Sequence, residues 1–329
     1  DAIQTGNGKL VYWTKDFFDV LDWQAVGLPA PAAGEVTLRH TAIGLNYIDT
    51  YHRSGLYALP LPSGLGLEAA GVVEAVGAGV TEFRIGDRVA YAGGICGAYS
   101  ERRNLAADVL VPLPDTVSDE TAAASMLAGM TAQYLLKRTR PVGAGDTLLW
   151  HAAAGGVGQI AVQWAKALGA TVIGTVGSED KAAIARSLGC DHVINYREEA
   201  FAPRVRELTQ GRGVPVVFDS VGAATFEGSL DSLAPRGMLV SFGNASGAVP
   251  PVSPNVLAAK GSLYLTRPRL ADYTATRAEL LETAADLFAV ISSGQVRISI
   301  GQRYALQDAA QAHRDLEARR TTGSTVLLP

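Results

Sequence analysis

The residues whose types and spacing point most clearly to a chemical role form a glycine-rich run after an apolar stretch. Residues 147–151 predict a buried strand, and residues 160–168 carry apolar side chains at helical spacing. A strand, a glycine turn and a helix in this order can bind a dinucleotide, because a side chain at the turn would keep the backbone away from the pyrophosphate. We therefore predict backbone contacts to a dinucleotide from Ala154, Gly155, Gly156, Val157 and Gly158.

The glycine motif is imperfect. In the pattern Gly-x-Gly-x-x-Gly the first position is Ala153, so the run could also be no more than a tight turn. The flanking strand and helix favour nucleotide binding. We expect Gly158 to let the helix close onto the sheet and Gly169 to end the helix in a left-handed conformation.

The end of the next strand indicates which dinucleotide binds. NAD sites place a carboxylate there to accept from the ribose 2'-hydroxyl, whereas this chain has Gly177 and Ser178. These small residues leave room for a 2'-phosphate, and Lys181 can supply positive charge. Glu179 is a rival ribose ligand, but it also suits a helix start. We predict NADPH as the cofactor.

Two later strand ends also carry small residues where open α/β sheets bind ligands. Each could equally be an ordinary strand-to-helix turn. The residues that we expect near the cofactor are Ser220, Val221, Phe242, Gly243 and Asn244.

The elements that must position these residues fall into two parts. Up to about residue 125 the chain shows short apolar runs between Gly and Pro, which predicts a β-rich domain. Further on, strands alternate with helices, which predicts a doubly wound parallel sheet. We expect its strands at residues 147–151, 171–176, 192–195, 214–219, 237–242 and 262–266, followed by a helix at 276–292 and a strand at 296–300.

Composition weighs against several functions. The chain has 28 Lys and Arg against 32 Asp and Glu, for a formal net charge of -4, so we expect no nucleic-acid partner. Cys96 and Cys190 lie too far apart in sequence for a metal cluster, and their scarcity is typical of the cytoplasm. The first thirty residues lack an apolar core, so we expect no secretory signal. The uncharged stretch 147–165 is broken by glycines, so we expect no membrane span.

The chain as a whole resembles the zinc-independent, zeta-crystallin-like quinone oxidoreductases of the medium-chain dehydrogenase/reductase superfamily. The resemblance rests on residues 44–49 with Tyr51, Arg53, Ser54, Gly55 and Tyr57, and on 64–71, 151–158, 195–196, 241–244 and 265–268. It implies an α/β fold with a GroES-like β-rich partial barrel (residues 1–125 and 271–329) and a Rossmann-like NADPH-binding domain (126–270). It also implies a cleft between the domains that holds the nicotinamide.

Zinc-dependent relatives carry Cys where this chain has Asn46, and a His-Glu pair where it has Leu67 and Glu68. Zinc needs about four N or S donors, so we expect no metal. The resemblance implies catalytic roles for Asn46, Asp49, Tyr51 and Arg267. It places Tyr47, Thr131 and Tyr134 around the nicotinamide, and Lys181, Tyr196 and Arg319 on the 2'-phosphate. His151 could act in catalysis, but a structural role is favoured because it ends a central strand.

The predicted activity is NADPH-dependent reduction of quinones in the cytoplasm. Asn46, Tyr51 and Arg267 can donate hydrogen bonds to an oxygen that gains negative charge. Alternatives are an enone or alkene reductase, or a non-enzymatic NADPH-binding structural or RNA-binding protein. Residues 262–265 predict an edge strand. Such a strand can pair with its copy across a two-fold axis, which predicts a homodimer. The physiological acceptor, the electron count and the proton donor stay open.

Overall fold

A computed structural model describes residues 7–12 and 21–329. The expected lack of a secretory signal rests partly on residues outside these ranges. The chain splits into two compact units, and each is described by itself. Unit 1 comprises Asp1–Met130, Thr274–Ser292 and Ile298–Pro329, and unit 2 comprises Thr131–Tyr273 and Ser293–Arg297. The limits that the sequence analysis gives for the two functional domains, residues 1–125 with 271–329 and residues 126–270, stay a prediction.

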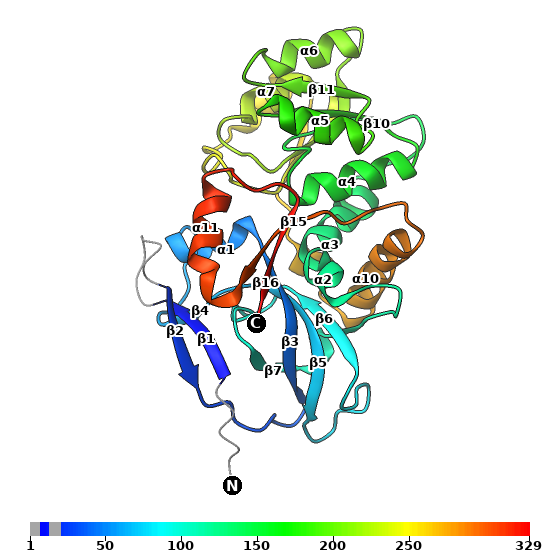
Figure 1. Cartoon of the computed structure of the whole chain (residues 1–329). Helices are drawn as coiled ribbons and strands as arrows, with labels where there is room; N and C mark the ends of the chain where they lie inside the picture. Colours follow the sequence, from blue (N-terminus) through cyan, green and yellow to red (C-terminus); the bar gives the residue numbers. More distant parts are fainter. Residues whose placement is uncertain (1–6, 13–20) are drawn as a thin grey trace. The chain divides into compact units, whose positions relative to one another are not determined.

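Unit 2 is built on a six-stranded sheet in the order β11-β10-β9-β12-β13-β14, with all neighbours parallel (Figure 1). The chain order reverses between β9 and β12, which is the switch point where such sheets bind ligands. The predicted doubly wound sheet is therefore confirmed. Its strands are β9 (Thr147–Trp150), β10 (Thr171–Val176), β11 (His192–Asn195), β12 (Val214–Asp219), β13 (Leu233–Ser241) and β14 (Tyr264–Thr266).

Helices connect these strands and cover their apolar side chains. Leu149, Ile173, Val217 and Leu239, from four neighbouring strands, belong to one buried cluster with Leu230 of α7. Burial on both faces explains why these strands are almost continuous apolar runs. The helices are α4 (Gly156–Ala167), α5 (Glu179–Ser187), α6 (Phe201–Leu208), α7 (Phe226–Ser232), α8 (Pro254–Ala259) and α9 (Leu270–Tyr273), with a π-helical turn at Leu135–Thr139.

Unit 1 contains a seven-stranded sheet in the order β15-β16-β3-β5-β6-β8, with β7 paired to β3, and a smaller sheet in the order β2-β1-β4 (Figure 1). In β3 the alternating residues Val36, Leu38, His40 and Ala42 are all buried, as their pattern predicts. The strands are β1 (Asn7–Tyr12), β2 (Leu21–Val26), β3 (Glu35–Leu45), β4 (Ser63–Gly64), β5 (Glu68–Val76), β6 (Arg88–Ala92), β7 (Arg102–Ala106), β8 (Val111–Pro112), β15 (Ile300–Ala305) and β16 (Ser324–Leu328).

The helices of unit 1 are α1 (Tyr47–Ser54), α2 (Asp119–Ala123), α10 (Arg277–Ser292) and α11 (Ala309–Glu317), and the unit border falls within α3 (Met126–Tyr134). Figure 1 shows α1 beside α11, and hydrogen bonds between them confirm the contact. The sequence analysis missed α1, which is too short to show helical periodicity and is ended by Gly55 at φ 78°.

One expected strand is wrong. Residues 296–299 are outside any strand, and β15 begins only at Ile300. Val296 is 1% exposed. Its apolar character reflects packing in the interior, and no neighbouring strand pairs with it.

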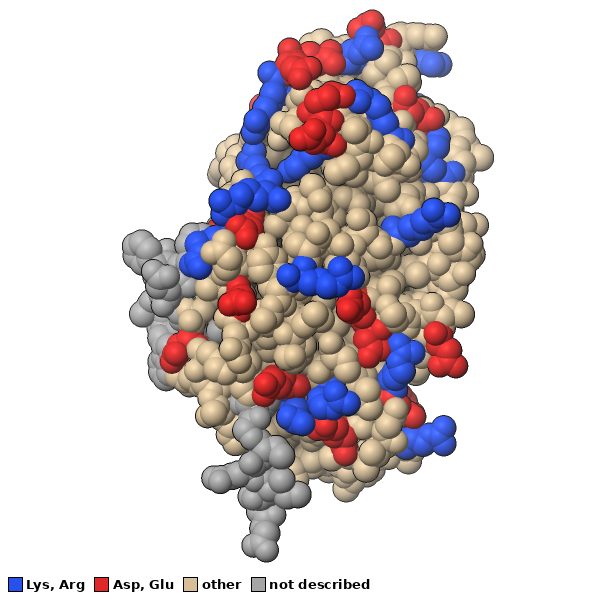
Figure 2. All heavy atoms as spheres, in the orientation of Figure 1, with Lys and Arg blue, Asp and Glu red and all other residues tan. Residues whose placement is uncertain are grey.

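On the face that Figure 2 shows, basic and acidic side chains are interspersed, and no broad basic area gathers there.

Candidate functional site

The turn between β9 and α4 is the core of the predicted cofactor site. Ala152 has a φ of 54°, and Gly155 is the N-cap of α4. A Cβ on Gly158 would lie 2.3 Å from the carbonyl oxygen of Ala152, so only glycine lets the helix start against the turn. Ala153 is fully buried opposite Gly174 of β10, where an added Cβ would lie 2.8 Å from the Ala153 Cβ. The missing first glycine of the motif is therefore compensated by a glycine on the next strand.

The start of α4 is open to an anion. A Cβ on Gly156 would meet no atom within 4 Å, so no packing inside the protein explains this glycine. The first turn of α4 contains no acidic residue, and no side chain caps it. Its N–H groups lack acceptors within the helix and form the positive end of the helix dipole. The backbone from Ala154 to Gly158 thus has the polarity and the open space that a pyrophosphate needs.

The carboxyl ends of β10 and β11 bring together four predicted cofactor residues. A Cβ on Gly177 would lie 2.3 Å from the Tyr196 hydroxyl, so this glycine admits the tyrosine ring. Ser178 caps α5 by accepting from the Lys181 N–H at 3.4 Å. Glu179, the rival ribose ligand, is ion-paired with Arg186 of its own helix at 2.5 Å. The structure therefore groups Gly177, Ser178, Lys181 and Tyr196, with Glu179 otherwise engaged.

The ends of β12 and β13 form a second group. A Cβ on Gly243 would lie 2.3 Å from the Ser220 carbonyl oxygen, so the two loops touch through their backbones. Arg267 donates from Nη1 to the Gly243 carbonyl at 3.0 Å and to Ser241 Oγ at 3.3 Å, and with the Asn244 amide turned it also donates to that side chain. A pocket of about 290 Å³ adjoins Arg267 and is lined by Phe226, Ser241, Asn244, Ala248, Val249 and Leu265. Val221 is the second residue after β12 and Phe242 the first after β13, so both belong to the same loops.

His151 is a structural residue. Its side chain is fully buried, and its ring nitrogens lie 2.8 Å from Thr175 Oγ1 and 3.0 Å from Ser229 Oγ. Burial lowers the pKa of its imidazole. Asp219 accepts from Ser229 Oγ at 2.8 Å and completes this buried network. Both ring nitrogens are engaged, so the favoured structural reading of His151 agrees with the geometry.

Four predicted site residues lie in unit 1, at the start of α1. Asn46 is the N-cap, and its backbone N–H donates to Asp49 Oδ2 at 2.9 Å. The rings of Tyr47 and Tyr51 meet edge to face, with centroids 5.5 Å apart. Asp49 is fully buried. In unit 2, Thr131 and Tyr134 lie on α3, and Tyr134 stacks on Tyr273 with centroids 4.6 Å apart.

The sequence analysis missed a buried hydrogen-bond chain that fixes α1. The Tyr99 hydroxyl donates to Asp49 Oδ2 at 3.0 Å and lies 3.0 Å from His313 Nε2. Arg53 is 3.2 Å from His313 Nδ1 and is paired with Glu317 at 2.7 Å. These partners are far apart in sequence, and no local motif marks them. Arg319, predicted for the 2'-phosphate, is exposed just after α11 and lies in unit 1, unlike Lys181 and Tyr196.

Comparison with known proteins decides the family. The model described as alcohol dehydrogenase GroES-like domain matches residues 32–141, and that described as zinc-binding dehydrogenase matches residues 156–286. A quinone oxidoreductase of Pseudomonas aeruginosa is 57% identical over 312 residues, covering 94% of this chain and 96% of that protein. The chain belongs to the quinone oxidoreductase group of the medium-chain dehydrogenase/reductase superfamily.

Two further relatives bear on ligands. The structure of Escherichia coli quinone oxidoreductase complexed with NADPH matches with a TM-score of 0.96 at 50% identity, covering 98% of this chain and 100% of that one. A 2-haloacrylate reductase of Burkholderia sp is 48% identical over 315 residues, covering 93% of this chain and 94% of that protein.

This member of the quinone oxidoreductase group carries no clustered metal ligands in the part that the structure describes. No set of three or more His, Cys, Asp or Glu side chains in residues 7–12 and 21–329 is arranged to hold a metal ion. At the positions of the zinc ligands named above, Asn46 is paired with Glu68, and Leu67 is buried. Within the same ranges no helix has both the length and the apolar character to cross a membrane.

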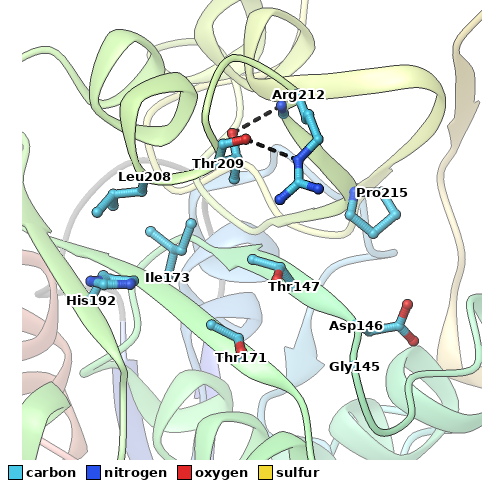
Figure 3. A pocket seen from close by; sticks show the side chains of 11 residues that line it. Gly145, Asp146, Thr147, Thr171, Ile173, His192, Leu208, Thr209, Arg212 and Pro215 are labelled. Atoms are coloured by element: carbon cyan, nitrogen blue, oxygen red, sulfur yellow. Dashed lines mark hydrogen bonds between the residues drawn. The ribbon is translucent and has the colours of Figure 1, made fainter.

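A second pocket lies at the opposite edge of the sheet of unit 2. Figure 3 shows its lining, which includes Thr147 and Thr171 at the starts of β9 and β10, His192 of β11, and Arg212. It measures about 290 Å³. The Arg212 Nε donates to the Thr209 carbonyl at 3.3 Å. None of the predicted site residues lines it, because cofactors bind these sheets at the carboxyl ends of the strands.

We expect buried carboxyl groups to make the stability of the protein fall with rising pH. Burial raises the pKa of Asp49 from 3.8 to about 7 and that of Glu68 from 4.5 to about 8. A raised folded-state pKa gives stability that is full below the ordinary pKa and is lost as the pH rises through the raised value. Burial lowers the pKa of His40 and His313 from 6.5 to about 4 and about 3. These histidines reduce the stability only as the pH falls below about 6.5, so they do not oppose the effect of the carboxyl groups at higher pH.

The free energy of unfolding in urea should therefore decrease between about pH 6.5 and 8, where those carboxyl groups dominate. Glu68→Gln should make this decrease shallower. An equal decrease in wild type and variant would contradict the assignment to Glu68.

Proposed function

We propose that this chain is an NADPH-dependent quinone reductase that works without zinc. The single observation that carries the proposal is the open backbone cradle at Gly156, in a chain 50% identical to an Escherichia coli quinone oxidoreductase whose structure contains NADPH. When bound, NADPH supplies the hydride or electrons. The protein binds and orients, and its polar side chains stabilise charge on the acceptor oxygen.

The roles that we propose for individual residues come from the resemblance described above. The α4 start and the loops with Ser220, Val221, Phe242, Gly243 and Asn244 hold the cofactor, and Tyr47, Thr131 and Tyr134 line its nicotinamide. Asn46, Tyr51 and Arg267 donate hydrogen bonds to the acceptor oxygen, and buried Asp49 positions Asn46 through its backbone. Arg319 joins Lys181 and Tyr196 on the 2'-phosphate.

The test is the oxidation of NADPH by the pure protein, followed by absorbance with a simple quinone, together with elemental analysis for zinc. We expect steady turnover and no stoichiometric metal. Binding of NADPH without turnover on any acceptor would favour the non-enzymatic role, and failure to bind NADPH would overturn the proposal.

A second candidate is reduction of an activated alkene, favoured by the 48% identity to a 2-haloacrylate reductase. The same cradle and donors would serve, because both reactions place negative charge on an oxygen conjugated to the reduced centre. Parallel assays with a quinone and a 2-haloacrylate separate the two: the physiological class should show a kcat/KM at least about tenfold higher, or about 1.4 kcal/mol.

The preference for NADPH predicts the behaviour of Ser178→Asp. Aspartate caps a helix as well as serine does, so α5 should be retained. The new carboxylate would repel a 2'-phosphate and accept from a 2'-hydroxyl. We expect the Kd of NADPH to rise at least about tenfold and that of NADH to fall, measured by calorimetry. Equal changes for both cofactors would mean that the 2'-phosphate binds elsewhere.

A homodimer in the cytoplasm completes the proposal. β14 is the edge strand of the unit 2 sheet, and Tyr264 on it is 59% exposed. An exposed strand edge can pair with a second copy across a two-fold axis. Sedimentation equilibrium should give a dimer at micromolar concentration, and Tyr264→Asp should shift it toward monomer. A monomeric wild type would remove this part of the proposal.

A further inference from the structure

Glu68, at the first position of β5, is buried without a charged partner. Its side chain is 2% exposed, and no Lys or Arg in the described residues forms an ion pair with it. Both carboxyl oxygens accept hydrogen bonds: Oε1 from Asn46 Nδ2 at 2.5 Å and Oε2 from the Leu127 N–H at 2.6 Å. Burying a carboxyl group has a free-energy cost, so we expect this buried carboxyl group to serve a function.

The neighbouring strand is shaped to receive this carboxyl group. Gly44 of β3 lies opposite Glu68 in the antiparallel ladder. A Cβ on Gly44 would lie 2.1 Å from Glu68 Oε1 and 2.2 Å from the Ala123 carbonyl oxygen. The glycine therefore provides the space that the carboxyl group occupies, two residues before Asn46.

Glu68 and the capping box of α1 together set which way the Asn46 amide faces, because the Asn46 side chain also accepts from the Asp49 N–H. A side-chain amide has an oxygen end that only accepts and a nitrogen end with two hydrogens to donate. Glu68 accepts one of these hydrogens, which leaves the second on the same nitrogen as a donor. With the carboxyl group gone, the amide could turn over and present its oxygen instead.

We infer that Glu68 is a positioning residue that holds the Asn46 amide with a hydrogen directed at the acceptor oxygen. The inference rests on the proposed function, in which Asn46 donates to that oxygen. A donor held in place before charge develops stabilises the transition state, and losing one such donor typically costs about 10²- to 10³-fold in kcat. Burial raises the pKa of Glu68 to about 8, while its hydrogen bonds to Leu127 and Asn46 favour the ionised form in which both oxygens accept, so kcat is to be compared above that pH.

The alternative is that Glu68 only ties the start of α3 to the sheet through Leu127. The two roles predict different results for Glu68→Gln. Glutamine has only one oxygen that can accept a hydrogen bond, and the fixed backbone N–H of Leu127 will keep it. The NH2 group of the glutamine then faces Asn46, so the Asn46 amide must turn over to offer its oxygen. We expect kcat for quinone reduction to fall at least about tenfold, with the Kd of NADPH within about twofold of wild type. The control is Glu74→Gln on the same strand, where Glu74 is 33% exposed and paired with Arg39 and Arg102.

A double-mutant cycle with Asn46→Ala decides between the roles. If Glu68 acts through Asn46, Glu68→Gln will cause no further loss of kcat in the Asn46→Ala background. An undiminished loss there, or a wild-type kcat in Glu68→Gln, would overturn the inference. Wild-type protein without quinone reduction would instead refute the proposed function. Should Glu68→Gln not fold, NMR of wild-type protein still tests the contact: one Asn46 side-chain hydrogen should be protected from exchange, and fast exchange of both would overturn it.

Discussion

Gly156→Val should lower the affinity for NADPH by about a hundredfold, or about 3 kcal/mol, and leave the fold intact. The reason is the contrast between the two roles of the glycines at the start of α4. Gly156 has open space where a Cβ would be, whereas Gly158 has a carbonyl oxygen 2.3 Å away. A side chain at Gly156 would therefore begin in open space, and a branched one would fill the volume that we propose for the pyrophosphate.

The matched control is Gly143→Val in the same unit. A Cβ at Gly143 also meets nothing within 4 Å, but this residue precedes β9 and is remote from the turn. Calorimetry should show wild-type affinity for Gly143→Val, and thermal unfolding should be alike for all three proteins. Tight NADPH binding by a folded Gly156→Val would show that the pyrophosphate lies elsewhere, whereas an unfolded variant would show that Gly156 is needed for packing.

The second large effect concerns stability. Asp219 at the end of β12 is 2% exposed, and its Oδ1 accepts from the N–H groups of Val221 and Gly222. Its Oδ2 accepts from the hydroxyls of Thr225 and Ser229, at 2.7 and 2.8 Å. Asp219→Ala would remove the acceptor of the Val221 and Gly222 N–H groups, would leave the Thr225 and Ser229 hydroxyls with only the Gly222 carbonyl and His151 as neighbours, and would open a void. Because each unsatisfied buried group costs about 1–3 kcal/mol, we expect a loss of roughly 4 kcal/mol in the free energy of unfolding.

Asp231→Ala provides the comparison. Asp231 lies on α7 of the same unit, with its side chain 54% exposed and paired only at the surface with Lys260. Its removal should change the free energy of unfolding by less than about 0.5 kcal/mol. Urea titration of the three proteins gives both numbers. Similar stability of the two variants would mean that the Asp219 network is not a structural centre of unit 2.

The sheet of unit 2 was largely predictable because its signals are local. Strands β10, β11 and β12 have the predicted bounds, and β10 and β12 are short, almost entirely buried runs with few polar residues. The turn at Gly155 and Gly156 was visible for a similar reason, as backbone that approaches a phosphate tolerates no side chain. By contrast, the segment 296–299 has the composition of a strand but no partner to pair with, and composition does not reveal pairing.

The site in unit 1 was only partly predictable. The resemblance pointed to Asn46, Asp49 and Tyr51, but it did not indicate that Asp49 is fully buried or that Tyr99 and His313 hold it. A hydrogen bond between distant residues leaves no periodic trace in the sequence. Such partners emerge only when strands and helices from different parts of the chain have packed.

The amino-acid sequence by itself determined the strand-turn-helix that can take a dinucleotide, because those constraints act within a few neighbouring residues. Only the tertiary structure decided what surrounds Asn46. The pairing of β3 with β5 brings Glu68 against Gly44, and the start of α3 supplies the Leu127 N–H. A carboxyl group can remain buried there because these distant segments together provide its space and its two donors.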